Sequence, residues 1–267
     1  CSYKAGGTCV LRKTHNIRSK AMISTLKEQL AIDTNCSKED FDKIKNTVTI
    51  LCHNDLKRRN ISNDLLLFMA CFGKGTVAAV DKELEPFMTK YTENMDGFRC
   101  FDMPLRTLEN ELKKHGGIIS EIEEFYLLNE NKICQVTPAF DVEILEGAAI
   151  EKLYSDHRFH MAMGYSQESD RRDMIAAAAY ENGEILGVAA ASNDTDNIWQ
   201  IGVDVVPEKR QYHIATDIVR IISNEVLKRN KIPYYGTAWS NIASKRVAVN
   251  AGYKPVWVEM KAMRNSI

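Results

Sequence analysis

The chain has 267 residues, and 45% of them are hydrophobic, which is enough to bury the cores of two domains of ordinary size. Charged residues make up 27% of the chain, yet the net charge is only −1. This balance argues against a nucleic-acid-binding protein and against a polybasic membrane-surface protein. The longest apolar run, 65–72, is far shorter than the roughly 20 residues that span a bilayer, so we expect a core strand there.

The cysteines are scattered through the first half of the chain without a C-x-x-C pair, and their number, seven, is odd. Zinc sites need clustered ligands, so we expect buried thiols in a reducing compartment rather than a metal site or disulfides. With no signal-peptide pattern in view, we predict a cytoplasmic protein. The sequence begins without a methionine, which leaves room for residues before it. The cysteines are Cys1, Cys9, Cys36, Cys52, Cys71, Cys100 and Cys134.

The first half of the chain predicts an α/β domain over residues 1–135, to which we assign no role. Helical spacing of Met22, Leu26 and Leu30 predicts a helix over 17–32. The other predicted elements are a short helix at 39–45 capped by Ser37, strands at 47–52 and 65–72, a helix from Asp81 to 92 that contains Pro86, a helix from Pro104 to 114 ended by Gly116-Gly117, and a strand at 122–128.

A polar segment at 129–138 ends in proline and is expected to link this domain to a second one, over 139–267. The Asn182-Gly183 pair is a strong signal for a hairpin turn. The predicted strands are 142–145, 173–180, 185–191, 199–206, 233–238 and 253–260, and the predicted helices are 148–154, 214–228 and 243–250. Meandering strands followed by a crossover helix predict a mixed, mostly antiparallel sheet with flanking helices, so the fold class is α/β of the α+β kind.

The segment 199–215 indicates an anion site. An apolar strand stops at Pro207, a basic turn containing Arg210 follows, and an amphipathic helix begins at about Ile214. The first backbone N–H groups of a helix have no internal partner, and the helix dipole favours negative charge there. The order and spacing fit the pyrophosphate of a coenzyme. The alternative is an ordinary helix N-terminus beside a solvated arginine.

Two motifs in this half resemble those of the GNAT superfamily of N-acetyltransferases. Val205-x-Pro207, Arg210 and Ala215 match the acyl-CoA-binding motif, but His213 stands where the family has glycine. Glycine lets the backbone approach phosphate closely, whereas a Cβ must point away. Further on, Asn241-Ile-Ala-Ser244 and Gly252-Tyr253 have the spacing of the family's second motif. The resemblance covers about half of the chain, from Phe140 to the C-terminus.

The resemblance implies a GNAT-type mixed sheet, acetyl-CoA as cosubstrate, no metal, and transfer of an acetyl group to an amine of a small molecule or peptide. It implies no nucleic-acid or membrane partner, and an N-terminal domain that covers the acceptor side or forms a homodimer. It also implies that main-chain groups of the strand before the motif polarise the thioester carbonyl. The implied coenzyme-binding residues are Val203, Val205, Arg210, His213, Ile214, Ala215, Thr216 and Asn241.

The proton carriers are harder to predict. The tyrosine that many family members use as general acid is replaced by Ala248. Asp204 on the strand and Ser244 on the last helix are the candidate catalytic residues, although a lone Asp in a strand is more often structural, and Asn241 can serve simply as an N-cap. The alternative function is a non-catalytic acyl-CoA-binding or regulatory protein.

Two other patterns favour a structural interpretation. Residues 73–78 fit the G-x-G-x-x-A dinucleotide fingerprint, but that fingerprint needs a helix at the glycines, and 76–80 is β-prone. We therefore expect a hairpin with a Gly-Lys-Gly turn. The Asp156 to His160 run lacks the spacing of a metal site and is expected to be a loop at a helix end.

Overall fold

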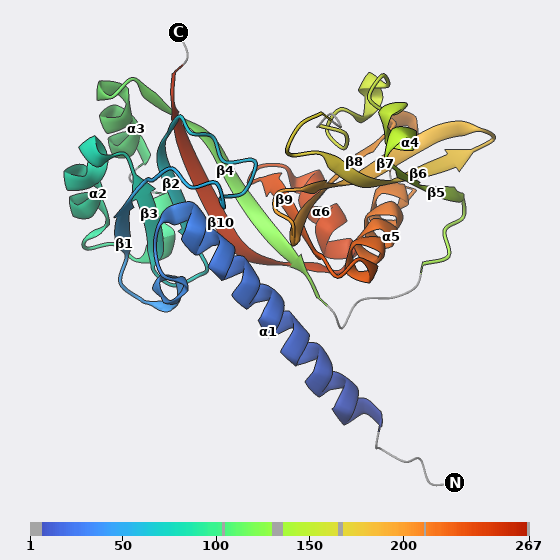
Figure 1. Cartoon of the computed structure of the whole chain (residues 1–267), viewed down its shortest axis with the longest axis horizontal. Coiled ribbons are helices and arrows are strands. Elements are labelled where there is room, and N and C mark those ends of the chain that lie inside the picture. Colours follow the sequence, from blue (N-terminus) through green and yellow to red (C-terminus); the bar gives the residue numbers. More distant parts are fainter. Residues whose placement is uncertain (1–6, 103–104, 130–135, 165–167, 211, 266–267) are drawn as a thin grey trace. The chain divides into compact units, whose positions relative to one another are not determined.

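Figure 1 shows a computed structural model of the chain, which describes residues 7–102, 105–129, 136–164, 168–210 and 212–265. The chain forms two compact units. Unit 1 contains residues 1–26, 127–235 and 246–254, and unit 2 contains residues 27–126, 236–245 and 255–267.

These units are not the sequential segments 1–135 and 139–267 of the sequence analysis. Segments 236–245 and 255–267 group with residues 27–126. The boundaries between the units fall within two strands, 232–238 and 253–264, so each of these strands contributes residues to both units. Part of the expected linker, 130–135, lies outside the described residues. Separate folding of the two sequential domains stays a prediction.

Unit 2 is built on strands in the order β1-β3-β2-β10-β4. β1 runs parallel to β3, whereas β2 is antiparallel to both β3 and β10. β2 is buried along its whole length, which explains its uninterrupted apolar sequence. The bounds are β1 Thr47–Ile50, β2 Leu65–Cys71, β3 Thr76–Val80, β4 Gly117–Leu128 and β10 Tyr253–Arg264, the last two longer than predicted.

The helices predicted for the first half are present, but their bounds differ: α1 starts at residue 7 rather than 17, and the helix expected at 39–45 is a 3-10 turn at 38–42. The 3-10 turn at 97–101 was not predicted. The predicted helix from Asp81 is a 3-10 turn, η2 (Lys82–Leu84), followed by α2 (Glu85–Thr92). Pro86 therefore lies in the first turn of α2, where a missing N–H costs nothing. The Asp81 carboxylate accepts the N–H of Glu83 at 3.0 Å. The others are α1 Gly7–Thr34, η1 Lys38–Asp42, η3 Gly97–Phe101 and α3 Leu105–Lys114. Pro104 lies outside the described residues.

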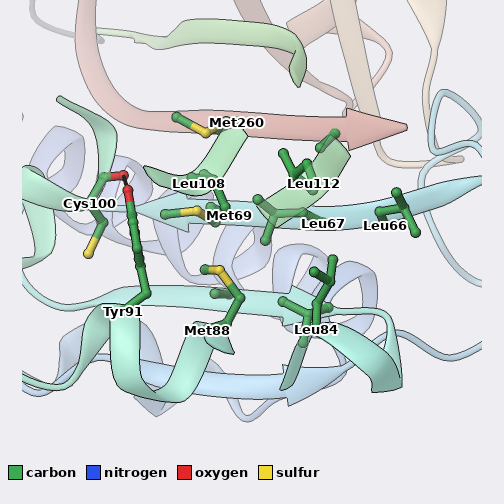
Figure 2. Close-up of a cluster of buried hydrophobic side chains, with 13 residues drawn as sticks. Leu66, Leu67, Met69, Leu84, Met88, Tyr91, Cys100, Leu108, Leu112 and Met260 are labelled. Atoms are coloured by element: carbon green, nitrogen blue, oxygen red, sulfur yellow. Dashed lines mark hydrogen bonds between the residues drawn. The ribbon is translucent and has the colours of Figure 1, made fainter. Parts of the chain in front are cut away.

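The core of unit 2 lies where α2 and α3 pack on the strands, as Figure 2 shows. Met88 of α2, Leu108 of α3 and Met69 of β2 are fully buried there. Cys100 lies in the same cluster, and burial raises the pKa of its thiol to about 11. Of the four described cysteines, all free thiols, Cys71 and Cys100 are buried as expected, whereas Cys36 and Cys52 are only partly buried. The other three cysteines lie outside the described side chains.

The G-x-G-x-x-A segment is a hairpin, as predicted. Cys71 of β2 pairs with Thr76 of β3, and Gly73 takes the turn with φ +84°. Strand β3 follows the glycines directly, so these glycines do not open a helix as the dinucleotide fingerprint requires.

Unit 1 is built on strands in the order β9-β8-β7-β6-β5. β5 to β8 are joined antiparallel, and β8 pairs with β9 in parallel, which is the mixed, mostly antiparallel sheet predicted. Asn182 and Gly183 form the β6–β7 turn with φ +52° and +82°, as the Asn-Gly signal indicated. The bounds are β5 Asp141–Glu146, β6 Asp173–Glu181, β7 Glu184–Asn193, β8 Ile198–Val205 and β9 Ile232–Ala238.

Helices cover both faces of this sheet. β6 and β7 carry runs of fully buried alanines, so α5 (Ile214–Lys228) can pack close to them. A Cβ at Gly187 would lie 3.4 Å from the Ile214 side chain, whereas a Cβ at Gly202 would lie 2.8 Å from the Met161 carbonyl. Paired residues of β7 and β8 share a face of the sheet, and successive residues alternate between the faces. Gly187 is paired with Val205, an odd number of positions from Gly202, so the two glycines lie on opposite faces. α5 and the segment around Met161 therefore cover opposite faces of the sheet.

The remaining helices of unit 1 are short. The predicted helix 148–154 is reduced to α4 (Ala148–Glu151), after which Leu153 and Tyr154 make i→i−3 bonds instead. The last helix, α6 (Ile242–Asn250), contributes residues to both units. Among the residues that the structure describes, no helix combines the length and apolar character needed to cross a bilayer.

Candidate functional site

The pairing of β8 with β9 stops halfway along β8. The parallel register runs from Ile198 opposite Ile232 to Ile201 opposite Tyr235, and the described residues show no further β8–β9 pair. β8 nevertheless continues to Val205, held by β7 on its other side alone. We call residues 202–205 the open edge of β8.

The main chain of Val203 and Val205 points to this open edge. Gly187 of β7 pairs with Val205, and the N–H of Val206 bonds the carbonyl of Leu186, the residue before Gly187. Residue 206 therefore directs its main chain toward β7. Alternate residues of a strand point their N–H and C=O groups to opposite sides. Val205 and Val203 therefore direct theirs away from β7. Consistent with this, the Val205 carbonyl accepts a 3.3 Å bond from Nε of Arg210 rather than from a strand.

The chain then turns through η6 (Pro207–Lys209) into the N-terminus of α5, which begins at Ile214 as predicted. His213 occupies the N-cap position with φ +61° and ψ +5°, and its side chain caps no N–H. This is the left-handed conformation that glycine adopts most readily. The backbone at position 213 thus has a glycine-like conformation although the residue is histidine.

The N-terminus of α5 leaves its first amides available. The first intrahelical acceptor is the His213 carbonyl, which receives the N–H of Asp217 at 3.0 Å. The amides of Ile214, Ala215 and Thr216 come before it and have no carbonyl within the helix to bond. Burial raises the pKa of the Asp217 carboxyl, although Arg220 and His213 oppose that shift. The site thus combines directed N–H groups with the exposed guanidinium of Arg210.

Asp204 lies on the open edge but is engaged in the structure. Its Oδ2 accepts the backbone N–H of Met161 at 2.7 Å and that of Ala162 at 3.0 Å. These bonds hold the segment that follows η5 (His157–Phe159) against the sheet face. The preceding Asp156–His160 run, expected to be a loop, instead forms η5 with Asp156 as its N-cap, and Asp156 pairs with Arg158.

The second motif forms a capped helix in the structure. Oδ1 of Asn241 accepts the N–H of Ser244 at 3.1 Å, so Asn241 is the N-cap of α6. Asn241 and Ser244 belong to unit 2, whereas the open edge and the start of α5 belong to unit 1. Contact of Asn241 with a coenzyme and a proton-carrying role of Ser244 stay predictions. Ala248 is fully buried.

Sequence analysis missed a buried polar cluster at the paired end of β8. Arg171 forms an ion pair with Asp194, and the Tyr234 hydroxyl donates to the other oxygen of that carboxylate. Gln200 accepts from Arg171 at 2.5 Å. No motif could have revealed the cluster, because directly bonded members such as Asp194 and Tyr234 lie 40 residues apart in sequence. Within the described ranges, no group of His, Cys, Asp and Glu could hold a metal ion.

A scan against models of protein families and a search of curated proteins find no match to the chain. Solved structures similar to it include a GCN5-related N-acetyltransferase-like protein from Streptococcus suis, at 12% identity and a TM-score of 0.46, over 61% of this chain and 69% of the other. A GNAT-family acetyltransferase from Colwellia psychrerythraea is 12% identical with a TM-score of 0.43, over 55% of this chain and 57% of the other. The aminoglycoside N-acetyltransferase AAC(6')-Iy, solved with CoA, is 16% identical with a TM-score of 0.36, over 46% of this chain and 93% of the other.

Proposed function

We propose that the protein is an N-acetyltransferase that takes its acetyl group from acetyl-CoA. The observation that carries the proposal is the open edge of β8, which leads through a left-handed residue 213 into the uncapped N-terminus of α5. Unpaired main-chain groups on a strand and directed amides at a helix start suit an extended ligand that ends in phosphates. Coenzyme A has this character.

The residues present fit such a ligand. The amides of Ile214, Ala215 and Thr216 would bind the pyrophosphate, with Arg210 as the nearby cation. His213 would keep the backbone turned toward the phosphates. The main-chain groups of Val203 and Val205 would bind the pantetheine arm and polarise the thioester carbonyl.

In the reaction, the nitrogen of the acceptor amine forms a bond to the acetyl carbon, and the bond from that carbon to sulfur breaks. The amine nitrogen gives up a proton, and the departing thiolate gains one. The protein supplies positioning and carbonyl polarisation, which together account for a large part of such rate enhancements. Asp204 is held by two backbone amides, so solvent would carry the protons.

The acceptor is proposed to be a small-molecule or peptide amine, and the protein to act in the cytoplasm without a metal, nucleic-acid or membrane partner. A homodimer is also proposed, mediated by the N-terminal domain over residues 1–135. These proposals follow from the motif resemblance and from the unremarkable charge of the chain.

The test uses the full chain. Titration calorimetry with CoA should show saturable binding, and incubation with acetyl-CoA and a panel of amines should release free thiol faster than acetyl-CoA alone. A folded protein that does not bind CoA would refute the proposal.

A non-catalytic acyl-CoA-binding protein is the second candidate. It is favoured by the buried Ala248 at the position of the family's tyrosine and by the engaged carboxylate of Asp204. CoA binding without acetylation of any amine in the panel would support it.

A further inference from the structure

We propose that the buried cluster of Arg171, Asp194, Gln200 and Tyr234 fixes the point at which β8 and β9 separate, with Tyr234 as a positioning residue for the thioester. The inference rests on the proposed function, since it concerns how the open edge of β8 is kept available.

The cluster joins the two strands immediately before they part. Gln200 of β8 and Tyr234 of β9 are register partners, and the next pair, Ile201 with Tyr235, is the last one. The Tyr234 hydroxyl lies 3.4 Å from Oε1 of Gln200 and also donates to Asp194. Side chains of both strands therefore join one hydrogen-bonded cluster, one residue away from the separation point.

Two further segments hold that carboxylate in place. Asp194 follows the last residue of β7, and Arg171 precedes β6. Nε of Arg171 donates to Asp194, while Nη2 of the same side chain donates to Gln200 at 2.5 Å. Arg171 thus bridges Asp194 to β8, and Tyr234 bridges Asp194 to β9.

Burial makes these contacts specific to one register. Asp194 and Tyr234 are fully buried and Arg171 is 8% exposed, so water cannot replace a lost partner. The positive charge of Arg171 is balanced by the negative charge of Asp194. Moving β9 along β8 would withdraw the hydroxyl from Asp194 and leave a buried carboxylate one bond short. The parallel pairing covers only Ile198–Ile201 and would hold the register weakly by itself.

The consequence concerns the residues that follow. With the last pair fixed at Ile201 and Tyr235, the main-chain groups of Val203 stay uncovered. If β9 shifted along β8 or paired with it beyond Ile201, the main-chain groups of Val203 would bond β9 and would no longer be available to the ligand. The cluster would thus set the position of the thioester along β8 without touching it.

The experiment compares Tyr234→Phe with Tyr154→Phe in the full chain. Tyr154 is a matched control, because its hydroxyl also donates to a buried carboxylate of unit 1, that of Asp173 on β6 at 3.0 Å. Calorimetry would give the dissociation constant for CoA, and thermal unfolding would give the stability of each variant. We expect Tyr234→Phe to weaken CoA binding about tenfold and Tyr154→Phe to change it less than twofold.

Hydrogen exchange provides a direct readout of the separation point. In Tyr234→Phe the amide of Ile201, which is directed toward β9, should exchange faster than in the wild type, and in Tyr154→Phe it should not. If Tyr234→Phe does not fold, Gln200→Leu, at a less buried position, takes its place with the same expectations.

CoA affinity unchanged in Tyr234→Phe, or lowered equally in both variants, would overturn the inference. Absence of CoA binding by the wild-type protein would instead refute the proposed function, so the two failures are distinguishable.

Discussion

Asp204 accepts the backbone N–H of Met161 at 2.7 Å, a bond between residues 43 positions apart in sequence. A second bond from Ala162 shares the same oxygen. The carboxylate that sequence analysis selected as a candidate base therefore anchors the loop that covers β8.

Replacing this carboxylate should affect stability more than chemistry. Asp204→Ala leaves two backbone amides without their acceptor and should lower the free energy of unfolding by about 2–3 kcal/mol. Asp204→Asn keeps one oxygen acceptor and should lose less. Urea unfolding measures both, with the exposed Glu208→Ala as control. An Asp204→Asn variant of normal stability whose acetylation rate falls by a factor of about 100 would show that Asp204 is a base.

The left-handed backbone of His213 predicts opposite effects of two substitutions. A side chain with a Cβ costs roughly 1–2 kcal/mol in this conformation, and a β-branched one costs more. His213→Val should therefore destabilise the protein by about 1–2 kcal/mol, whereas His213→Gly should be neutral or slightly stabilising. Thermal unfolding checks this, with Tyr212→Val, at an exposed neighbour without positive φ, as control. Lower stability in the glycine variant than in the valine variant would contradict the expectation.

Arg210 should contribute to coenzyme affinity. Its guanidinium lies against the Val205 carbonyl, beside the start of α5, where the pyrophosphate is proposed to bind. Arg210→Ala should weaken CoA binding about tenfold, and the difference should shrink at high salt, because exposed charges are screened. Arg106→Ala, which removes an exposed arginine from α3, makes the same change in net charge and should leave the affinity unaltered. Equal losses in the two variants would indicate a general charge effect.

Introducing a tyrosine at position 248 should fail for lack of space. Ala248 is fully buried in α6, and overpacking a filled core typically costs about 1–3 kcal/mol. Ala248→Tyr should therefore lower the melting temperature, whereas Val249→Tyr, at a 46% exposed neighbour on the same helix, should not. If the Ala248→Tyr protein were as stable as the wild type and transferred acetyl groups faster, the surroundings of residue 248 would have to accommodate a tyrosine, contrary to this prediction.

Glu123 of β4 predicts a pH dependence of stability. Burial raises the pKa of its carboxyl to about 7; Glu259 and Glu121 add to the shift, and Lys261 and Arg58 oppose it. Between about pH 4.5 and 7 the unfolded chain ionises this group while the folded protein keeps the proton, so the free energy of unfolding falls as pH rises through this window.

Glu123→Gln should remove that fall and make the protein more stable than the wild type at pH 8. Chemical unfolding at pH 5 and pH 8 measures the difference. Glu121→Gln is the control: its carboxylate pairs with Lys261 at 2.7 Å, so its loss should give no gain at pH 8. A pH dependence of Glu123→Gln identical to that of the wild type would contradict the prediction.

Local signals in the sequence were sufficient for most elements. α5 occupies Ile214–Lys228 as predicted, because an amphipathic pattern follows a proline-terminated strand. The Asn182-Gly183 turn and the Gly-Lys-Gly hairpin were also predicted, since their conformations depend on the residues in the turn itself. The short form of α4 was not predicted, because its apolar pattern also fits a series of i→i−3 turns.

The sequence by itself determined the order of the elements, the mixed sheet and the candidate anion site at the start of α5, all of which depend on neighbouring residues. Only the tertiary structure decided where β8 leaves β9, that His213 takes a glycine-like conformation, and that Asp204 serves a loop. Tyr234 and Asp194, 40 residues apart, show the physical reason. Strand register and buried hydrogen bonds are set by partners distant in the chain, and no local pattern in one sequence encodes which partners meet.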